Sequence, residues 1–166
     1  MAELEANHGV LIRELTAGDW RPLERLWNSL YEHQRAHGML LEVPPQGYEL
    51  WIKSLQPLLG RFAFVFVAEE SNSIVGFLAG RLRAAPSQFG GAQLGHVSEV
   101  FVSDSHRQRG IGGALLTAAT DWFRKRGIRH VDLPVLANNL AGREFYRSHG
   151  WIEDVVQMVW REPTTP

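Results

Sequence analysis

The stretch from Arg107 to Gly113 reads RQRGIGG and places two arginines beside three glycines. Glycine lacks a Cβ, so a ligand can approach the backbone closely, and each arginine supplies positive charge. Apolar residues then recur at helical spacing as far as Trp122, which makes this stretch the start of a helix. The free N–H groups and the dipole at a helix N-terminus attract an anion. The pattern therefore predicts a site for a phosphate or pyrophosphate group.

Two widespread glycine-rich phosphate motifs do not fit this stretch. The dinucleotide fingerprint needs a glycine where the chain has Leu115, and the ATP-type loop needs a Gly-Lys-Ser/Thr sequence that is absent. The stretch instead resembles the Arg/Gln-x-x-Gly-x-Gly/Ala signature of the GNAT superfamily, the acetyl-CoA-dependent N-acyltransferases. Without that resemblance, it would be an ordinary glycine-rich helix start packed on a sheet.

A second segment strengthens the resemblance. Asn139 to Tyr146, followed by Gly150 and Trp151, is similar to the later Asn-x-x-Ala-x-x-Phe-Tyr-x-x-x-Gly-Phe segment of the same superfamily. The order and separation of the two segments also match, although Gly142 stands where that superfamily more often has alanine. Taken alone, the second segment would be a helix with two core aromatic residues and a glycine stop.

Composition narrows the class of protein. A chain of 166 residues with 45% hydrophobic content is long enough for one domain over residues 1–166, and no linker-like run divides it. The net charge of -1 gives no general attraction to nucleic acid or to an anionic membrane. The absence of cysteine excludes disulfides and thiolate nucleophiles, and no apolar run has membrane-spanning length. The first ten residues lack the apolar core of a signal peptide, so we expect a cytoplasmic protein.

The elements that must position these two segments can be read from hydrophobic spacing and turn residues. Strands are expected over residues 10–15, 62–69, 74–83, 97–102 and 131–135, with a last strand or hairpin over 151–161. Helices are expected after residues 16–19, after 44–45, after 110 and over 138–149. An irregular, mobile loop is expected over residues 84–94, and a disordered tail over 163–166. Pro134 cannot donate to a ladder, so strand pairing should fail near it.

The resemblance implies a fold of the α/β (α+β) class, the GNAT fold. Its mixed, mostly antiparallel sheet has six to seven strands, and about four helices cover both faces. Its two central parallel strands splay apart, and the pantetheine arm of the acyl donor lies in the gap. Pro134 is consistent with this splay, although an edge strand also explains the proline.

The resemblance further assigns roles to individual residues. The backbone groups of Phe101 and Val102 are expected to pair with the pantetheine arm and to polarise the thioester carbonyl. Tyr146 matches a cofactor-contacting general acid toward the thiolate, and Asn139 matches a residue that contacts the cofactor or orients that end of the site. Read alone, Tyr146 would be a core tyrosine. The pyrophosphate is expected to contact Arg107, Gln108, Arg109, Gly110, Ile111, Gly112 and Gly113.

Two residues of the expected central strand are candidates for the general base. Strict alternation places His96 on one face and Glu99 on the other. Histidine titrates near neutral pH, and the position of His96 matches one at which some GNAT members carry a base. Glu99 takes this role if a bulge shifts the alternation, and some members use no side-chain base.

The sequence thus predicts an N-acetyltransferase that moves an acetyl group from acetyl-CoA to a primary amine of a small molecule or peptide. Transfer would be direct, in a ternary complex, without a metal. The acceptor is expected between the first two helices and the loop over residues 84–94. Its lining would be Trp27, Tyr31, Tyr48 and Trp51, which also read as core residues. The alternative is a non-catalytic acyl-CoA-binding or regulatory module with the same fold, and a homodimer through the strand after Trp151 is also open.

Overall fold

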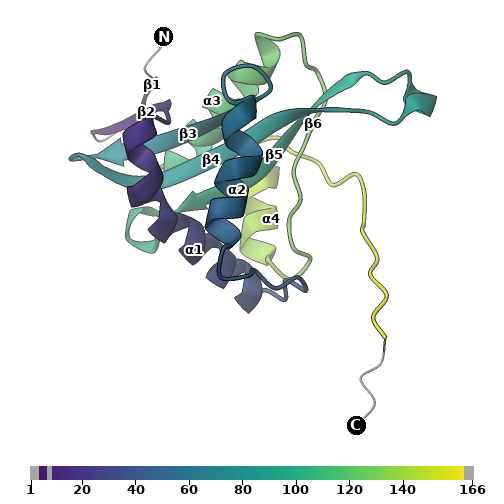
Figure 1. The fold of residues 1–166 in the computed structure, drawn as a ribbon, viewed down its shortest axis with the longest axis horizontal. Helices are drawn as coiled ribbons and strands as arrows, with labels where there is room; N and C mark the ends of the chain where they lie inside the picture. Colours follow the sequence, from purple (N-terminus) through teal and green to yellow (C-terminus); the bar gives the residue numbers. More distant parts are fainter. Residues whose placement is uncertain (1–3, 7–8, 163–166) are drawn as a thin grey trace.

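The computed structural model describes residues 4–6 and 9–162, which form one six-stranded sheet with helices on both faces (Figure 1). The strands follow the order of the sequence: β1 (Leu4–Ala6), β2 (Val10–Glu14), β3 (Ala63–Glu70), β4 (Ser73–Ala84), β5 (Gln93–Val102) and β6 (Val131–Asp132). The helices are α1 (Trp20–Ala36), α2 (Gly47–Leu55), α3 (Ile111–Arg124) and α4 (Leu140–Ser148). Neighbouring strands pair antiparallel from β1 to β5, and β6 pairs parallel to β5. The mixed sheet and the helices on both faces are confirmed, and β1 was not expected.

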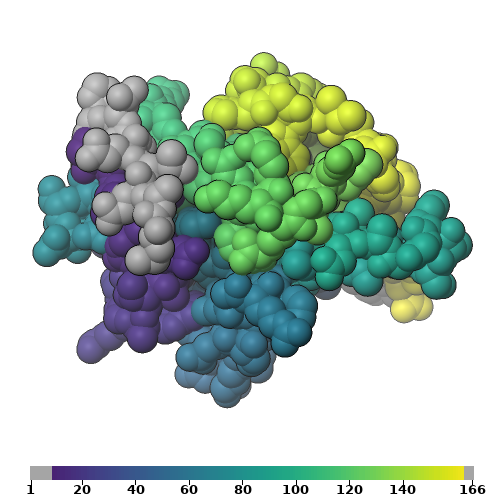
Figure 2. All heavy atoms as spheres, turned by 90° about the horizontal axis from the view of Figure 1, so that it is seen from above, coloured from purple at the N-terminus to yellow at the C-terminus, as the bar shows by residue number. Residues whose placement is uncertain are grey.

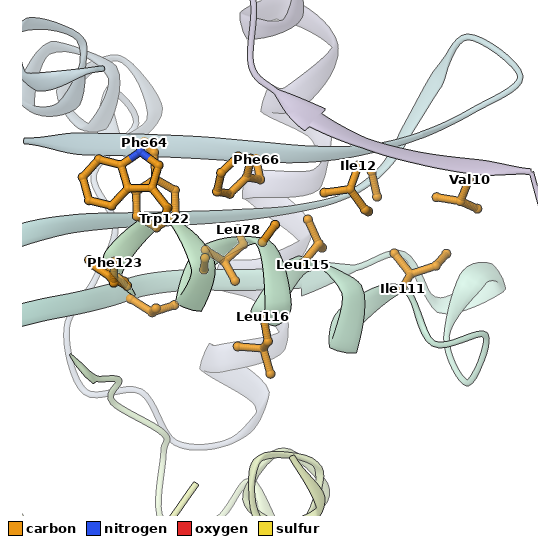
Figure 3. Packing of buried hydrophobic residues seen from close by; sticks show 14 of the residues in the cluster. Val10, Ile12, Phe64, Phe66, Leu78, Ile111, Leu115, Leu116, Trp122 and Phe123 are labelled. Carbon is orange, nitrogen blue, oxygen red and sulfur yellow. The ribbon is translucent and has the colours of Figure 1, made fainter. Parts of the chain in front are cut away.

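Helix α3 covers one face of the sheet. Its apolar residues recur every three or four positions, so they form one stripe against the strands (Figure 3). Ile111, Leu115 and Phe123 are at most 1% exposed, and burying each such side chain contributes about 1.5–3 kcal/mol. The strand side of this core includes Val10, Ile12, Phe64, Phe66 and Leu78.

Helices α1 and α2 cover the opposite face. Leu23, Leu26 and Trp27 of α1 pack in a second core, together with Phe77 of β4 and Phe101 of β5. Strands β3 and β4 are therefore buried on both faces over much of their length, which explains their long apolar runs.

Strands β4 and β5 form a long hairpin that projects from the body (Figures 1 and 2). Pairing continues to Ala84 and Gln93, so the expected loop over residues 84–94 is too long by its first position and its last two. Only residues 85–92 lie between the strands, with a short helical turn at Ser87–Phe89.

Strands β5 and β6 pair at two positions only, Gly95 with Val131 and His96 with Asp132. Strand β6 ends before Leu133 and Pro134, because proline has no N–H to donate. The expected strand over residues 131–135 is therefore shortened to two residues. The two parallel strands part beyond His96, but β6 lies at the edge of the described sheet and not at its centre, which corrects the sequence-based expectation.

The segment from Trp151 to Arg161 forms no strand, so the prediction of a last strand or hairpin is wrong. Glu153 binds Arg143 and Arg147 of α4, which ties the start of the segment to that helix and not to the edge of β6. The segment then runs away from the sheet (Figure 1). The expected disordered tail over residues 163–166 lies outside the described residues. Within the described ranges, the helices are too short or too polar to cross a membrane.

Candidate active site

The glycine-rich stretch lies at the N-terminus of α3, as predicted. Gly110 is the N-cap residue with a φ of 77°, and Gln108 has a φ of 60°, both in the left-handed region. The first backbone bond of the helix runs from the Ala114 N–H to the Gly110 carbonyl. The N–H groups of Ile111, Gly112 and Gly113 therefore have no partner within the helix and can bind an anion.

The two arginines of this stretch are already engaged by the protein. Arg109 forms a two-pronged ion pair with Glu70, at the end of β3. Arg107 donates to the Val102 carbonyl over 3.1 Å and pairs with Asp104 over 2.9 Å. Both side chains are thus fixed beside the turn, with their charge partly neutralised.

The glycines at the start of α3 serve its contact with α4. A Cβ on Gly112 would lie 2.9 Å from the Phe145 ring, and a Cβ on Gly113 would lie 2.6 Å from Nε2 of His149. The missing side chains of these two glycines thus make room for a neighbouring helix, while contact of their backbone with a ligand stays a prediction. Gly110 differs, because its positive φ is what favours glycine there and no atom lies close to its missing Cβ.

Helix α4 carries Asn139 and Tyr146. The Asn139 carboxamide oxygen accepts a 2.9 Å hydrogen bond from the Gly142 N–H, so Asn139 caps the helix. Tyr146 packs on the α3 core and against the rings of Phe145 and Trp151. Burial raises the pKa of Tyr146 to about 12, so its hydroxyl holds its proton at neutral pH.

The backbone of β5 alternates between β4 and the open edge. The Phe101 carbonyl points toward β4, since a Cβ on Gly76 would lie 3.0 Å from it. The Val102 carbonyl points the other way and accepts from Arg107. Of the two residues expected to offer backbone groups at the splay, Val102 does so, whereas Phe101 is turned toward the sheet.

A β-bulge in β5 lies at Ser98. Ala79 pairs with Glu99 and Gly80 pairs with Val97, so Ser98 has no partner in the register. The bulge moves Glu99 to the face that carries His96, the face covered by α1 and α2. The expectation of strict alternation, with His96 and Glu99 on opposite faces, is therefore wrong.

Glu99 is a buried carboxylate, 7% exposed. Its oxygens accept hydrogen bonds from Ser98 and, over 3.4 Å, from the Tyr31 hydroxyl of α1. Burial raises the pKa of Glu99 above its usual range, opposed by hydrogen bonds from Ser98, the Trp51 indole and Tyr31. A pKa shifted by burial is a common feature of carboxylates that act as acids or bases in catalysis.

His96 lies at the last paired position before β5 and β6 part. Its Nδ1 is 2.6 Å from Oδ1 of Asp132, and Arg83 of β4 binds the other oxygen of the same carboxylate. Burial tends to raise the pKa of Asp132, but the hydrogen bonds from His96 and Arg83 outweigh burial and hold it below the usual range.

Comparison with known proteins identifies the family of this chain. The model of the acetyltransferase (GNAT) family matches residues 20–151. The chain belongs to this family. An uncharacterized N-acetyltransferase of Methanocaldococcus jannaschii, MJ1207, is 36% identical over 95 residues, which are 57% of this GNAT chain and 42% of that protein. The chain therefore spans less than half the length of that relative.

Two further proteins resemble the GNAT chain over most of its length. An uncharacterized N-acetyltransferase of Bacillus subtilis, YhfO, is 27% identical over 143 residues, which are 86% of this chain and 90% of that protein. An aminoglycoside N-acetyltransferase, AAC(6')-Iy, solved in complex with CoA, superposes with a TM-score of 0.74 over 93% of this chain and 95% of its own. Its sequence is 17% identical, so this likeness shows the fold alone.

The GNAT chain also has a groove of about 510 Å³ between α1 and the turn after β5. Glu32 and His33 line it from α1, and Phe101 and Arg107 line it from the other side. The groove lies at the C-terminal end of β5, so it does not coincide with the expected acceptor position beside residues 84–94. The alternative reading as core residues is confirmed for Trp27 and Tyr48, which are buried.

Sequence reasoning missed two parts of this GNAT site, and it gave the bulge in β5 only as an alternative. Asp132 and Arg83 beside His96 become visible only in the strand register, because they lie 36 and 13 positions away in the chain. The bulge at Ser98 has no glycine to mark it. The sequence predicts Tyr31 as an acceptor-lining or core residue, whereas the structure places its hydroxyl on Glu99.

Proposed function

We propose that this GNAT chain transfers an acetyl group from acetyl-CoA to a primary amine by direct attack within a ternary complex. One observation carries the proposal: the open N-terminus of α3, the unpaired edge of β5 and the Tyr146 helix meet at one end of the sheet. Strand β5 leads through a short turn into α3, and Gly112 at the start of α3 faces Phe145, the neighbour of Tyr146.

In the proposed reaction the amine nitrogen forms a bond to the thioester carbonyl carbon, and the bond from that carbon to sulfur then breaks. His96 or Glu99 takes the proton that the ammonium must lose, and Tyr146 gives a proton to the departing thiolate. The backbone of β5 at the splay polarises the carbonyl. The backbone N–H groups of Ile111 to Gly113 hold the pyrophosphate.

The first test is binding of the acyl donor. Gly112→Val is a poor variant, because its side chain would also strike Phe145. Arg107→Gln is better matched, since Arg124→Gln removes the same charge from a second ion pair of the same i,i+3 spacing at the far end of α3. Calorimetric titration with acetyl-CoA and CoA should give saturable binding that weakens in Arg107→Gln and not in Arg124→Gln.

The same titration decides the proposal. Ligand at 100 times its dissociation constant should add about 2.7 kcal/mol to the free energy of unfolding. No binding by the folded wild-type chain would overturn it. Binding of CoA without acetylation of any amine in a broad panel would instead support a non-catalytic acyl-CoA-binding module.

The acceptor amine belongs to the same proposal. AAC(6')-Iy is named as an aminoglycoside N-acetyltransferase, and the likeness to it is one of fold. The panel should therefore include aminoglycosides, polyamines, amino acids and peptide N-termini, with release of the CoA thiol as the readout. The single domain over residues 1–166, a homodimer and a cytoplasmic location stay predictions.

A further inference from the structure

Three side chains from three strands meet where the sheet splits. His96 of β5 contacts Asp132 of β6 through Nδ1, at 2.6 Å, and Arg83 of β4 holds the second oxygen of Asp132. His96 and Asp132 are also the last paired positions of β5 and β6. The contact therefore stands at the vertex of the splay, beside the gap that the proposed function assigns to the acyl donor.

We propose that Asp132, oriented by Arg83, is a positioning residue that fixes the tautomer of His96. The proposal rests on the proposed function in one respect, namely that His96 is the general base. Asp132 accepts the Nδ1–H of the neutral imidazole, so the lone pair of His96 lies on Nε2. Nε2 is the atom that takes the proton that the acceptor ammonium must lose before its nitrogen can attack.

Only one arrangement of hydrogen-bond donors and acceptors fits Arg83, Asp132 and His96. An ionised carboxylate only accepts hydrogen bonds, and a guanidinium only donates them. The pKa of Asp132 lies below its usual range, so Asp132 is ionised at neutral pH and Nδ1 must be the donor. Nε2 forms no hydrogen bond within the described residues, and the His96 side chain is 21% exposed. Its lone pair is thus available to a ligand.

Charged side chains near His96 come from both strands beside β5, which are β4 and β6. Asp132 is its anionic contact, and Glu99 lies on the same face of β5. Arg83 offsets part of the charge of Asp132, Arg81 is the cross-strand partner of His96, and His130 bonds through its backbone to Gly95. From the helices that cover this face, Tyr31 of α1 is bound to Glu99. Of these groups, Asp132 is the carboxylate in hydrogen-bond contact with the imidazole, so it sets the position of the proton.

The Asp132→Asn variant should keep the orientation of the His96 ring while changing its tautomer. Arg83 has only donors, so it turns the amide oxygen of the new side chain toward itself and leaves the NH₂ group facing Nδ1. Nδ1 must then accept, which moves the proton of the neutral ring to Nε2. The ring keeps its place, but Nε2 can no longer act as a base. Asp121→Asn is the matched control, because it makes the same change in the Asp121–Arg124 pair on α3.

The deciding experiment is the ¹⁵N spectrum of the histidine side chains above neutral pH, with His96 assigned through His96→Ala. Wild type and Asp121→Asn should show His96 with its proton on Nδ1, and Asp132→Asn should show the proton on Nε2. Either the Nε2–H form or fast exchange between tautomers in the wild type would overturn the proposal. This readout requires no turnover, so it stands apart from the test of the proposed function.

Kinetics complete the test on the acetylated amine. Asp132→Asn should lower kcat about 10²-fold with little change in the KM for acetyl-CoA, as expected when a general base is lost. A kcat loss in Asp132→Asn with the Nδ1–H tautomer retained would overturn the proposal. Full activity of His96→Ala would instead contradict His96 as the base, with the tautomer result unaffected.

Discussion

His96 and Glu99 lie on the same face of β5, although they are three positions apart in a strand. The bulge at Ser98 adds one residue between them and so reverses the alternation that would separate them. Both candidate bases consequently face α1 and α2, one half-buried beside Asp132 and the other enclosed by Tyr31 and Ser98. The site therefore carries two titratable side chains on one surface: His96, which is cationic when protonated, and Glu99, which is anionic when deprotonated.

Glu99→Gln should flatten the pH dependence of stability. Burial raises the folded pKa of Glu99, so the protonated acid is favoured in the folded state. Its contribution is fully present below the unfolded value near 4.5 and is lost as the pH rises through the folded value. Urea unfolding from pH 4 to pH 8 should show the wild type losing stability relative to Glu99→Gln as the pH rises. A parallel pH dependence of the two proteins would show that burial of Glu99 carries no cost.

Tyr146→Phe should lower kcat by about 10²-fold while leaving the fold intact. The tyrosine hydroxyl forms no hydrogen bond within the described residues, so its loss removes no internal contact. With the pKa of Tyr146 at about 12, the hydroxyl is protonated throughout the working pH range and can donate. Steady-state rates and thermal unfolding of the two proteins check this. An unchanged kcat would leave Tyr146 as a packing residue.

Gly112→Ala should destabilise the protein through its contact with α4. The new Cβ lies 2.9 Å from Phe145, and overpacking of this kind costs about 1–3 kcal/mol, offset in part by the better helix propensity of alanine. Phe145→Leu should relieve the clash, so the double variant should be more stable than the sum of the single changes predicts. Gly18→Ala is the control, because no atom lies within 4 Å of its Cβ position. Additive effects would contradict the contact.

Asp19→Asn should lower the free energy of unfolding by about 2 kcal/mol at neutral pH. This loss is smaller than that for breaking a fully buried ion pair, because the Arg13 side chain is 24% exposed. Arg13 binds Asp19 through two hydrogen bonds and holds its pKa well below the usual range, against burial, and the Thr16 N–H adds to this. A lowered folded pKa stabilises the protein above the unfolded value of 3.8, and this stability is lost as the pH falls. The two proteins should therefore begin to converge in acid unfolding as the pH falls below 3.8, and should become equal only once the pH has passed the folded pKa of Asp19. The exposed pair of Asp104 should show no such effect in Asp104→Asn.

The sequence was sufficient for the elements that local patterns control. Apolar residues at helical spacing predicted α3, and the strand patterns over residues 62–69 and 74–83 predicted β3 and β4. The two strands are joined by a tight hairpin at Ser71 and Asn72, which both have positive φ. Pro134 predicted the loss of pairing after β6. In each case, the residues that decide the structure are neighbours in the chain.

The features that the sequence did not predict depend on contacts between residues that are distant in the chain. Whether Gly112 admits a ligand or Phe145 depends on where α4 packs, and a helix pattern does not state that position. The apolar residues after Trp151 have a strand pattern, but a strand needs a neighbour, and Glu153 is held by arginines of α4 instead. The partners of His96 and Glu99 come from other strands and from α1, so only the register reveals them.

The extended segment after Trp151 gives the molecule an optical label of its own. All six tryptophans lie within the described residues, and of these Trp160 alone is exposed, at 81%. Trp27 and Trp122 are buried in the two cores, on opposite faces of the sheet. Trp20, Trp51 and Trp151 are partly exposed, so red-edge excitation and quenching by iodide weight the emission toward Trp160. The environment of this one segment can be followed in solution without a dye and without altering the chain.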